Sequence, residues 1–344
     1  MTGKTSSPAR MDSFKADLAT ICGSAHVLEG DNIDARYLRD WLGKAESHPA
    51  LVVRPPDTAA VLAVMRLCAE TKTPVIPFGG NSGLAGGTVA AAGQNIVLLS
   101  LERMNRVREI NAAGRFMVAE AGCIIEQLHA VAASESLMFP LVFGAKGTAQ
   151  IGGALSTNAG GLNVVRYGNA RHLCLGLEVV TANGEVMDLL PALKKDNTGY
   201  DLVNLIIGAE GTLGIITAAS LALVPPPPAL ATAMVKLRDL DAALALMNLA
   251  QAESSGRVEA FELIGRLHYE LCARHLAHVT PPFDEAADLA VMIEIAAGST
   301  DDATIGDDGT LPLATKLETI LATAMEEGWI SDAVVAQSAA QRSN

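Results

Sequence analysis

Short apolar runs alternate with longer amphipathic segments along most of the chain, a pattern typical of strands separated by helices and turns. Leu51-Val52-Val53 predicts a short buried strand, and Asp57 is placed to N-cap a helix that runs to about Thr71. Asn183-Gly184, between two apolar runs, predicts a β-hairpin. The same pattern predicts strands at 74–78, 96–100, 107–111, 115–120, 175–181, 185–188 and 215–224, and helices at 124–134 and 202–207.

The four prolines Pro225 to Pro228 form a stiff extended break, and we place a domain boundary there. The predicted parts are an N-terminal helical arm at 1–48, a first domain at 49–225 and a second domain at 229–344. Past the prolines we predict strands near 232–237, 257–263 and 288–296, and helices near 241–253, 265–277 and 314–327. Ser331-Asp332 is expected to N-cap a last helix at 332–341. With three strands, the second domain is expected to be incomplete.

A glycine-rich stretch at 77–87 reads Pro-Phe-Gly-Gly-Asn-Ser-Gly-Leu-Ala-Gly-Gly and carries no charge. Glycines between two strands let backbone N–H groups point outward without Cβ atoms in the way. Such a loop can surround a diphosphate, with Asn81 and Ser82 adding side-chain hydrogen bonds. The Rossmann pattern is missing because a strand-like run follows the loop, and Gly3-Lys4-Thr5 lacks the first glycine of a Walker loop. The alternative interpretation is a glycine-rich surface turn.

A second block, residues 139–169, is rich in glycine and asparagine and poor in charge. This composition indicates backbone packed closely against something flat and mostly apolar. Gly152-Gly153, near a predicted helix start, would let that helix approach a ligand. The two blocks together favour a nucleotide-cofactor site over two unrelated turns.

Composition excludes several classes of protein. The 344 residues are 50% hydrophobic with a net charge of −13, which argues against a nucleic-acid or anionic-membrane surface. No apolar targeting segment and no unbroken apolar span is visible, so we expect a soluble, cytoplasmic protein. The five scattered cysteines, without a C-x-x-C pair, fit reduced thiols better than disulfides or a zinc site.

Four segments in this order resemble the PCMH-type FAD-binding flavoproteins of the vanillyl-alcohol-oxidase superfamily. They are Pro77–Leu84, Gly147–Gly168, Asp196–Leu202 and Gly208–Ile215. Within that superfamily the sequence is most similar to the D-2-hydroxyglutarate, D-lactate and glycolate dehydrogenase group. The resemblance implies an α+β protein, in which a two-subdomain FAD-binding fold precedes an incomplete ferredoxin-like α/β substrate (cap) domain.

The resemblance also implies roles for particular residues. The loop would hold the FAD pyrophosphate, the second block would line the flavin and ribityl chain, and a third segment would meet the adenine or ribose. The implied cofactor residues are Pro77, Phe78, Gly79, Gly80, Asn81, Ser82, Gly83, Leu84, Ser100, Pro140, Gly144, Ala145, Thr148, Ile151, Gly152, Ser156, Asn158, Gly161, Gly211, Gly214 and Ile216. Because Gly79 to Gly83 contains no histidine or cysteine for a covalent link, non-covalent FAD is implied.

The catalytic residues are not identified. Relatives in this group carry a base and a divalent-metal site on His-x-x-Gly-Asp-Gly-Asn-x-His and Glu-His-Gly motifs, and neither motif occurs here. His275 and His278 have helical spacing but no convincing carboxylate beside them, so no metal site is assigned. Arg166, Lys195 and Asn197 could reach a substrate, although a structural role is the simpler reading. We therefore expect FAD binding with little turnover of a 2-hydroxy acid by this chain alone.

Three alternatives remain open. A UDP-sugar reductase shares the fold but needs an NADPH site and a proton-donating serine, which we do not find. A non-catalytic FAD subunit of a glycolate-oxidase-like complex would complete its sheet with a partner, and an inert fragment would aggregate. The substrate, the electron acceptor (a quinone, an electron-transfer flavoprotein or a cytochrome) and the choice between a homodimer and a partner subunit are not determined by the sequence.

Overall fold

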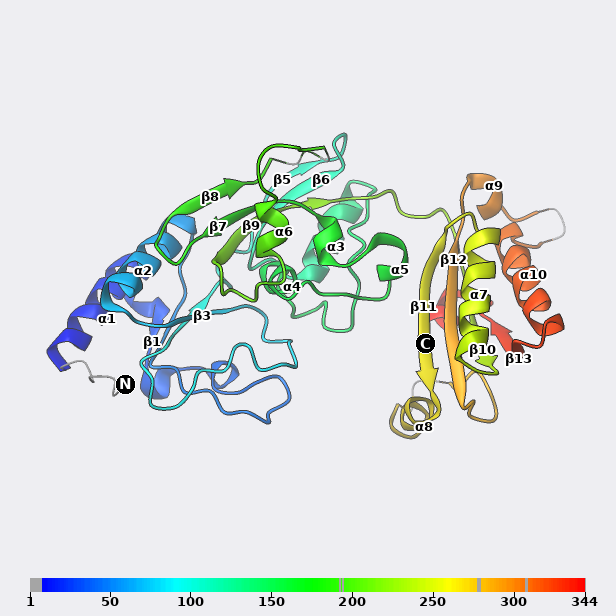
Figure 1. Ribbon diagram of the computed structural model, residues 1–344, viewed down its shortest axis with the longest axis horizontal. Coiled ribbons are helices and arrows are strands. Elements are labelled where there is room, and N and C mark those ends of the chain that lie inside the picture. Colours follow the sequence, from blue (N-terminus) through cyan, green and yellow to red (C-terminus); the bar gives the residue numbers. More distant parts are fainter. Residues whose placement is uncertain (1–7, 192, 194, 277–279, 307–308, 344) are drawn as a thin grey trace. The chain divides into compact units, whose positions relative to one another are not determined.

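The computed structural model describes residues 8–191, 193, 195–276, 280–306 and 309–343, and it divides into two compact units (Figure 1). The first unit comprises Met1–Gly160 and Asn169–Pro225. The second comprises Gly161–Gly168 and Pro226–Asn344. The chain therefore leaves the first unit briefly within the second glycine block, and finally between Pro225 and Pro226.

The first unit contains a four-stranded sheet with the order β1-β2-β4-β3. β2 and β3 both pair in parallel with β4, and α2 provides the crossover that parallel strands require. Asp57 caps α2 by accepting a hydrogen bond from the Ala60 N–H at 2.8 Å, as predicted. The elements of this part are α1 (Pro8–Cys22), β1 (Val27–Leu28), β2 (Leu51–Val53), α2 (Thr58–Thr71), β3 (Val75–Phe78) and β4 (Val97–Ser100).

The expected helical arm at 1–48 is α-helical only as far as Cys22 in the described residues. Short 3-10 turns at Ser24–His26, Gly30–Asn32 and Ala35–Tyr37 follow, and β1 pairs with β2 in the sheet. The Asp34 side chain accepts a hydrogen bond from the Arg36 N–H and so caps the turn at Ala35–Tyr37.

A five-stranded antiparallel sheet, ordered β5-β6-β9-β7-β8, forms the rest of the first unit. The hairpin predicted across Asn183-Gly184 joins β7 to β8, and Gly184 has the positive φ of 71° that such a turn requires. The elements here are β5 (Val107–Asn111), β6 (Phe116–Glu120), α3 (Ile125–Ser134), α4 (Ile151–Ser156), β7 (Cys174–Val180), β8 (Val186–Leu189), α6 (Leu202–Ile206) and β9 (Ile215–Ala222), with a 3-10 turn at Ala170–Leu173.

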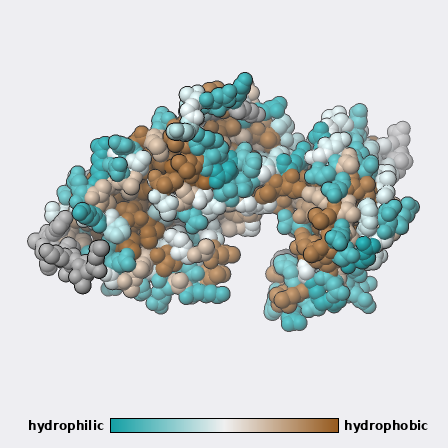
Figure 2. Space-filling view, in the orientation of Figure 1, coloured by the Kyte–Doolittle hydropathy of each residue, from teal (hydrophilic) through white to brown (hydrophobic). Residues whose placement is uncertain are grey.

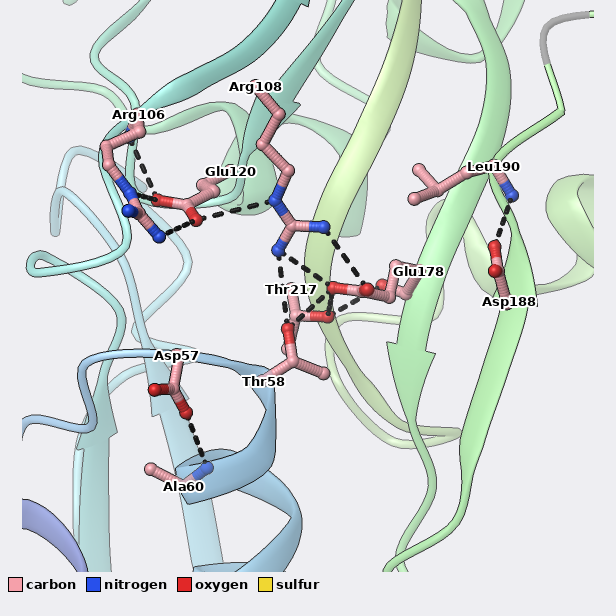
Figure 3. A network of polar contacts seen from close by, with 10 residues as sticks. All are labelled: Asp57, Thr58, Ala60, Arg106, Arg108, Glu120, Glu178, Asp188, Leu190 and Thr217. Carbon is pink, nitrogen blue, oxygen red and sulfur yellow. Dashed lines mark hydrogen bonds and ion pairs between the residues drawn. The ribbon is translucent and has the colours of Figure 1, made fainter.

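An ionic network ties α2 to four strands of this second sheet (Figure 3). Glu120 is 1% exposed and accepts a hydrogen bond from Arg108 Nε at 3.4 Å. Arg108 also bonds Glu178 at 3.1 Å, and the same carboxylate accepts from Thr58 at 2.6 Å and Thr217 at 2.7 Å. Because the Glu120 carboxylate is withdrawn from water, it needs such partners, and the hydrogen bonds of Glu178 with Thr58 and Arg108 tie α2 to the sheet.

The second unit is built around a four-stranded antiparallel sheet ordered β11-β12-β10-β13. In chain order this is the β-α-β-β-α-β arrangement of ferredoxin-like domains, with an extra helix, α8, between the second and third strands. Apolar residues of α7 and α10 form one buried core with the sheet, and Figure 1 shows both helices on one face. The elements are α5 (Val164–Tyr167), β10 (Leu230–Leu237), α7 (Leu240–Glu253), β11 (Val258–Gly265), α8 (Arg266–His275), β12 (Leu289–Ala296), α9 (Thr300–Ala303), α10 (Pro312–Glu326), β13 (Ile330–Val335) and α11 (Ala339–Ser343).

The predicted last helix at 332–341 is wrong. Ile330–Val335 is instead the fourth strand, β13, and only Ala339–Ser343 is helical. β13 pairs antiparallel with β10, and Ile330 packs into the core while Asp332 points away from it. The backbone N–H and C=O groups of β13 pair with a strand that lies about 100 residues earlier in the sequence. The N-cap prediction used only neighbouring residues, so it could not include this pairing. The expectation of three strands is therefore also wrong.

The fold class predicted from the sequence, α+β, is confirmed by these mixed sheets and helices. No helix within the described ranges is long and apolar enough to cross a membrane. Figure 2 shows hydrophobic residues in separate areas among hydrophilic ones on the visible face of the molecule.

Candidate cofactor-binding site

The glycine-rich loop starts from a fixed point in the first unit. Phe78, at the end of β3, is 3% exposed, and its ring lies 4.8 Å from the ring of Tyr37. The Tyr37 hydroxyl in turn donates to Ser100 Oγ at 3.4 Å, at the end of β4. Phe78 and Ser100 therefore belong to the packed base of the loop, and the residues after Phe78 project from it.

The loop makes its closest approach to the second glycine block at Gly80. A Cβ atom added at Gly80 would lie 2.1 Å from the carbonyl oxygen of Thr148, which only glycine allows. A Cβ at Gly79 would lie 3.7 Å from both Gln150 Oε1 and the Gly153 Cα. The structure thus brings together two segments that are separated by about 70 residues in the sequence.

The two adjacent glycines of α4 face different surroundings. A Cβ at Gly152 would lie 2.6 Å from the Ala121 Cβ, so Gly152 lets α4 pack onto the chain after β6. The Gly152 N–H donates to the Ala121 carbonyl at 2.8 Å, and the N–H of the buried Ile151 donates to the Cys123 carbonyl at 2.9 Å. Gly153 has no atom within 4 Å of its ideal Cβ. The side of α4 next to the loop is therefore the Gly153 side.

A third segment, 208–216, joins both glycine blocks. The Gly208 N–H donates to Leu155 at 3.0 Å, and the Glu210 N–H donates to Ser156 at 2.9 Å. Gly211 has a φ of +79°, and a Cβ there would lie 2.4 Å from Pro77 Cγ. Three of the segments named from the resemblance therefore converge on one place in the first unit.

Farther along this segment, predicted residues enter the sheet. Gly214 has a φ of +158°, and a Cβ there would lie 2.7 Å from the Val179 side chain. Ile216 is 3% exposed and pairs with Val179 between β9 and β7. Both residues therefore contact β7 in the sheet of the first unit.

Two asparagines of the predicted set use their side chains to hold backbone. Asn81, with a φ of 52°, donates from Nδ2 to the carbonyls of Arg36 at 3.2 Å and Arg39 at 3.0 Å. Asn158, with a φ of 49°, accepts from the Arg171 N–H at 3.0 Å. These bonds fix the shape of both loops, since asparagine tolerates the left-handed region.

The other predicted residues vary in exposure. Pro140 is buried, Ala145, Ser82 and Ser156 are half-buried, and Gly83, Leu84, Gly144 and Thr148 are exposed. The Ser156 hydroxyl donates to the Gly152 carbonyl at 2.7 Å. Gly161 falls in the second unit, unlike the rest of the set.

Gln150 is a candidate that the sequence reasoning missed. Its side-chain oxygen is buried beside Gly79, and it has no hydrogen-bond partner among the described residues. Buried polar atoms are almost always paired, so this oxygen is available to a donor group of a bound molecule. A single polar residue between Ala149 and Ile151, directly before α4, was the only signal in the sequence. Three backbone segments, 77–84, 145–158 and 208–214, meet here beside an acceptor without a described partner. We call this place the cradle, and it fits a nucleotide cofactor.

The structure assigns no catalytic group to this site. No cluster of three histidine, cysteine, aspartate or glutamate side chains is placed for a metal within the described parts of the chain. His275 is exposed at the end of α8, and His278 lies outside the described residues. Lys195 and Asn197 are exposed, whereas Arg166 forms an ion pair with Glu259 in the second unit.

The chain is similar in sequence to an FAD-binding family and to D-2-hydroxyglutarate dehydrogenases. Residues 49–190 match the family model described as an FAD binding domain. The chain is 38% identical over 305 residues to a D-2-hydroxyglutarate dehydrogenase of Xanthomonas citri pv. viticola, covering 89% of this chain and 61% of that protein. It is 36% identical over 324 residues to the mitochondrial D-2-hydroxyglutarate dehydrogenase of Arabidopsis thaliana, covering 94% and 56%. The chain thus spans less than two thirds of the length of these relatives.

Solved structures agree on the fold. An alkyldihydroxyacetonephosphate synthase superposes with a TM-score of 0.74 at 16% identity, covering 96% of this chain and 62% of that one. A p-cresol methylhydroxylase with bound substrate has a TM-score of 0.74 at 18% identity, covering 96% and 67%. Identities this low establish a shared fold and no shared activity.

Proposed function

We propose that this chain, which belongs to the PCMH-type FAD-binding flavoproteins of the D-2-hydroxyglutarate dehydrogenase group, serves in the oxidation of a D-2-hydroxy acid with FAD as its cofactor. The observation that supports this is the convergence of the two glycine blocks at Gly80 and Thr148. The named relatives favour this activity over the UDP-sugar reductase alternative.

When bound, the cofactor would supply the redox chemistry, as the acceptor of a hydride from the hydroxy acid. The chain supplies the binding surface. The backbone N–H groups of Gly79 to Gly83 would suit a pyrophosphate, since glycines have no Cβ to cover them. Gln150 Oε1 offers a hydrogen-bond acceptor beside them. Gly153 leaves open space on the adjoining side of α4.

The oxidation also needs a base for the substrate hydroxyl and a cation for its carboxylate. The His-x-x-Gly-Asp-Gly-Asn-x-His and Glu-His-Gly motifs that carry such groups in the resembled dehydrogenases do not occur in this sequence. We therefore propose that the chain binds FAD and, alone, oxidises a 2-hydroxy acid slowly or not at all. D-2-hydroxyglutarate is the substrate we would test first, because both relatives named above act on it by name. The electron acceptor and the oligomeric state stay predictions.

The test separates binding from chemistry. Purified protein is stripped of flavin and titrated with FAD, and the flavin absorbance is then followed anaerobically after adding D-2-hydroxyglutarate, with the L-enantiomer as control. We expect a yellow complex that bleaches slowly or not at all. A protein that does not bind FAD contradicts the assignment, and rapid bleaching specific to the D-enantiomer contradicts only the expected lack of turnover.

A further inference from the structure

The chain makes a short excursion within the second glycine block. Gly161–Gly168, which includes α5, belongs to the second unit, although the residues on both sides belong to the first. Val165, one of its two valines, packs against the core formed by the sheet of the second unit with α7 and α10. The excursion therefore interrupts the segment whose other residues form the cradle.

One buried carboxylate anchors this excursion. Glu259 of β11 is 2% exposed. Its Oε1 accepts from Asn163 Nδ2 at 3.3 Å, its Oε2 accepts from Tyr167 Oη at 3.5 Å, and it forms an ion pair with Arg166. Asn163 Nδ2 also lies 3.3 Å from the Glu259 carbonyl oxygen. In the part of the chain that the structure describes, every hydrogen-bond or ion-pair partner of this carboxylate lies in the excursion.

The chemistry makes this a strong anchor. Burial raises the pKa of the Glu259 carboxyl, and the Arg166 guanidinium opposes that shift. A carboxylate withdrawn from water is tolerated only with such partners. If the excursion moved away from Glu259, a buried charge would be left unpaired, which costs free energy. The Arg166 guanidinium lies 5.0 Å from the centre of the Tyr167 ring, which restricts both side chains further.

The two ends of the excursion are closed against each other within the first unit. The Ala170 N–H donates to the Ala159 carbonyl at 2.9 Å, next to the bond between Asn158 and Arg171. Arg171 Nη2 also donates to the Ile207 carbonyl at 2.6 Å. The next residue, Gly208, bonds α4, as described above. The ends of the excursion are thus part of the contacts that join the second glycine block to the third segment of the cradle.

We propose that Glu259 is a positioning residue for the cofactor, which holds the excursion and thereby the cradle segments at its two ends, without touching the cofactor itself. This rests on the proposed FAD binding. When the anchor is lost, the excursion gains conformational freedom, and binding FAD must then order it again. The expected consequence is weaker FAD binding from a substitution in the other unit.

The experiment compares two buried glutamates of the same sheet. Glu259→Ala removes the anchor, whereas Glu294→Ala removes a carboxylate that is 6% exposed and bonds Thr232 and Arg342, and that has no hydrogen bond or ion pair with the excursion among the described residues. FAD dissociation constants are measured by quenching of flavin fluorescence, alongside urea unfolding and hydrogen exchange of 161–168. We expect about 3- to 30-fold weaker FAD binding for Glu259→Ala, and unchanged binding for Glu294→Ala. Glu259→Gln, which keeps the shape and an acceptor, should lie between Glu259→Ala and the wild type.

Each outcome decides something different. Faster exchange at 161–168 with unchanged FAD affinity overturns the proposal, as does an equal loss of affinity in both alanine variants. If Glu259→Ala does not fold, Asn163→Ala and Arg166→Gln loosen the same anchor from the other side, and unchanged affinity in both overturns it. A wild-type protein that does not bind FAD instead defeats the proposed function, which the wild-type titration shows before any variant is made.

Discussion

The close approach at Gly80 allows a quantitative test of the cradle. In Gly80→Ala the new methyl group would meet the Thr148 carbonyl oxygen at 2.1 Å and the Ala149 Cα at 3.0 Å. Carbon–oxygen contacts of this kind normally lie at about 3.3–3.6 Å, so one backbone segment must move by roughly 1 Å. Overpacking of this kind costs about 1–3 kcal/mol. We expect the free energy of unfolding of the FAD-free protein to fall by that amount.

The same displacement should weaken cofactor binding, because it separates the loop from the second block. A loss of about 2 kcal/mol in binding raises the FAD dissociation constant about 30-fold. Urea unfolding of the FAD-free protein measures the first effect, and titration with FAD measures the second.

Gly83→Ala is the matched control in the same loop. No atom lies within 4 Å of an ideal Cβ at Gly83, and its backbone is not in the left-handed region. The FAD-free Gly83→Ala protein should therefore keep the stability of the wild type. If Gly80→Ala is as stable as Gly83→Ala and binds FAD equally well, the two glycine blocks do not meet as described, and the reasoning fails.

Three further predictions concern stability and reactivity. Asp57→Ala, which removes the N-cap of α2, should lower the free energy of urea unfolding by about 1 kcal/mol, and an unchanged midpoint would contradict the cap. Burial alone would raise the pKa of Glu178, but hydrogen bonds from Arg108 and two threonines lower it overall. Its contribution to stability is therefore present above the unfolded pKa and lost as the pH falls through the folded pKa, so Glu178→Gln should flatten the acid limb of stability against pH. Burial raises the pKa of Cys123 to about 12, so iodoacetamide at pH 8 should label the partly exposed Cys272 much faster, as peptide mass spectrometry would show.

Local signals in the sequence predicted much of the fold. Asp57 predicted the start of α2, Asn183-Gly184 predicted the turn between β7 and β8, and the proline run marked the chain between β9 and β10. These features depend on residues close together in the chain, whose preferred torsions and side-chain caps act without the rest of the protein. The glycine blocks also indicated a nucleotide cofactor, because close backbone approach requires residues without a Cβ.

The site was only partly predictable for a different reason. Gly152 and Gly153 are identical in the sequence, yet Gly152 packs on Ala121 while Gly153 faces open space next to the loop. Gln150 carries no local signal of function, and it becomes a candidate only because its oxygen is buried without a partner in the described structure. The roles of these residues depend on contacts with distant segments of the chain, and the sequence alone does not show those contacts.

By itself, the sequence indicated many of the strands, turns and capped helices of the first unit, and it identified two charge-poor, glycine-rich segments suited to FAD. Only the tertiary structure decided that Ile330–Val335 pairs with β10 as a strand, and that Gly161–Gly168 is held by Glu259. Both outcomes satisfy backbone or charged groups through partners about 95 to 100 residues away. A backbone or a carboxylate takes whichever partner removes the cost of its burial, and that partner is known only once the chain has folded.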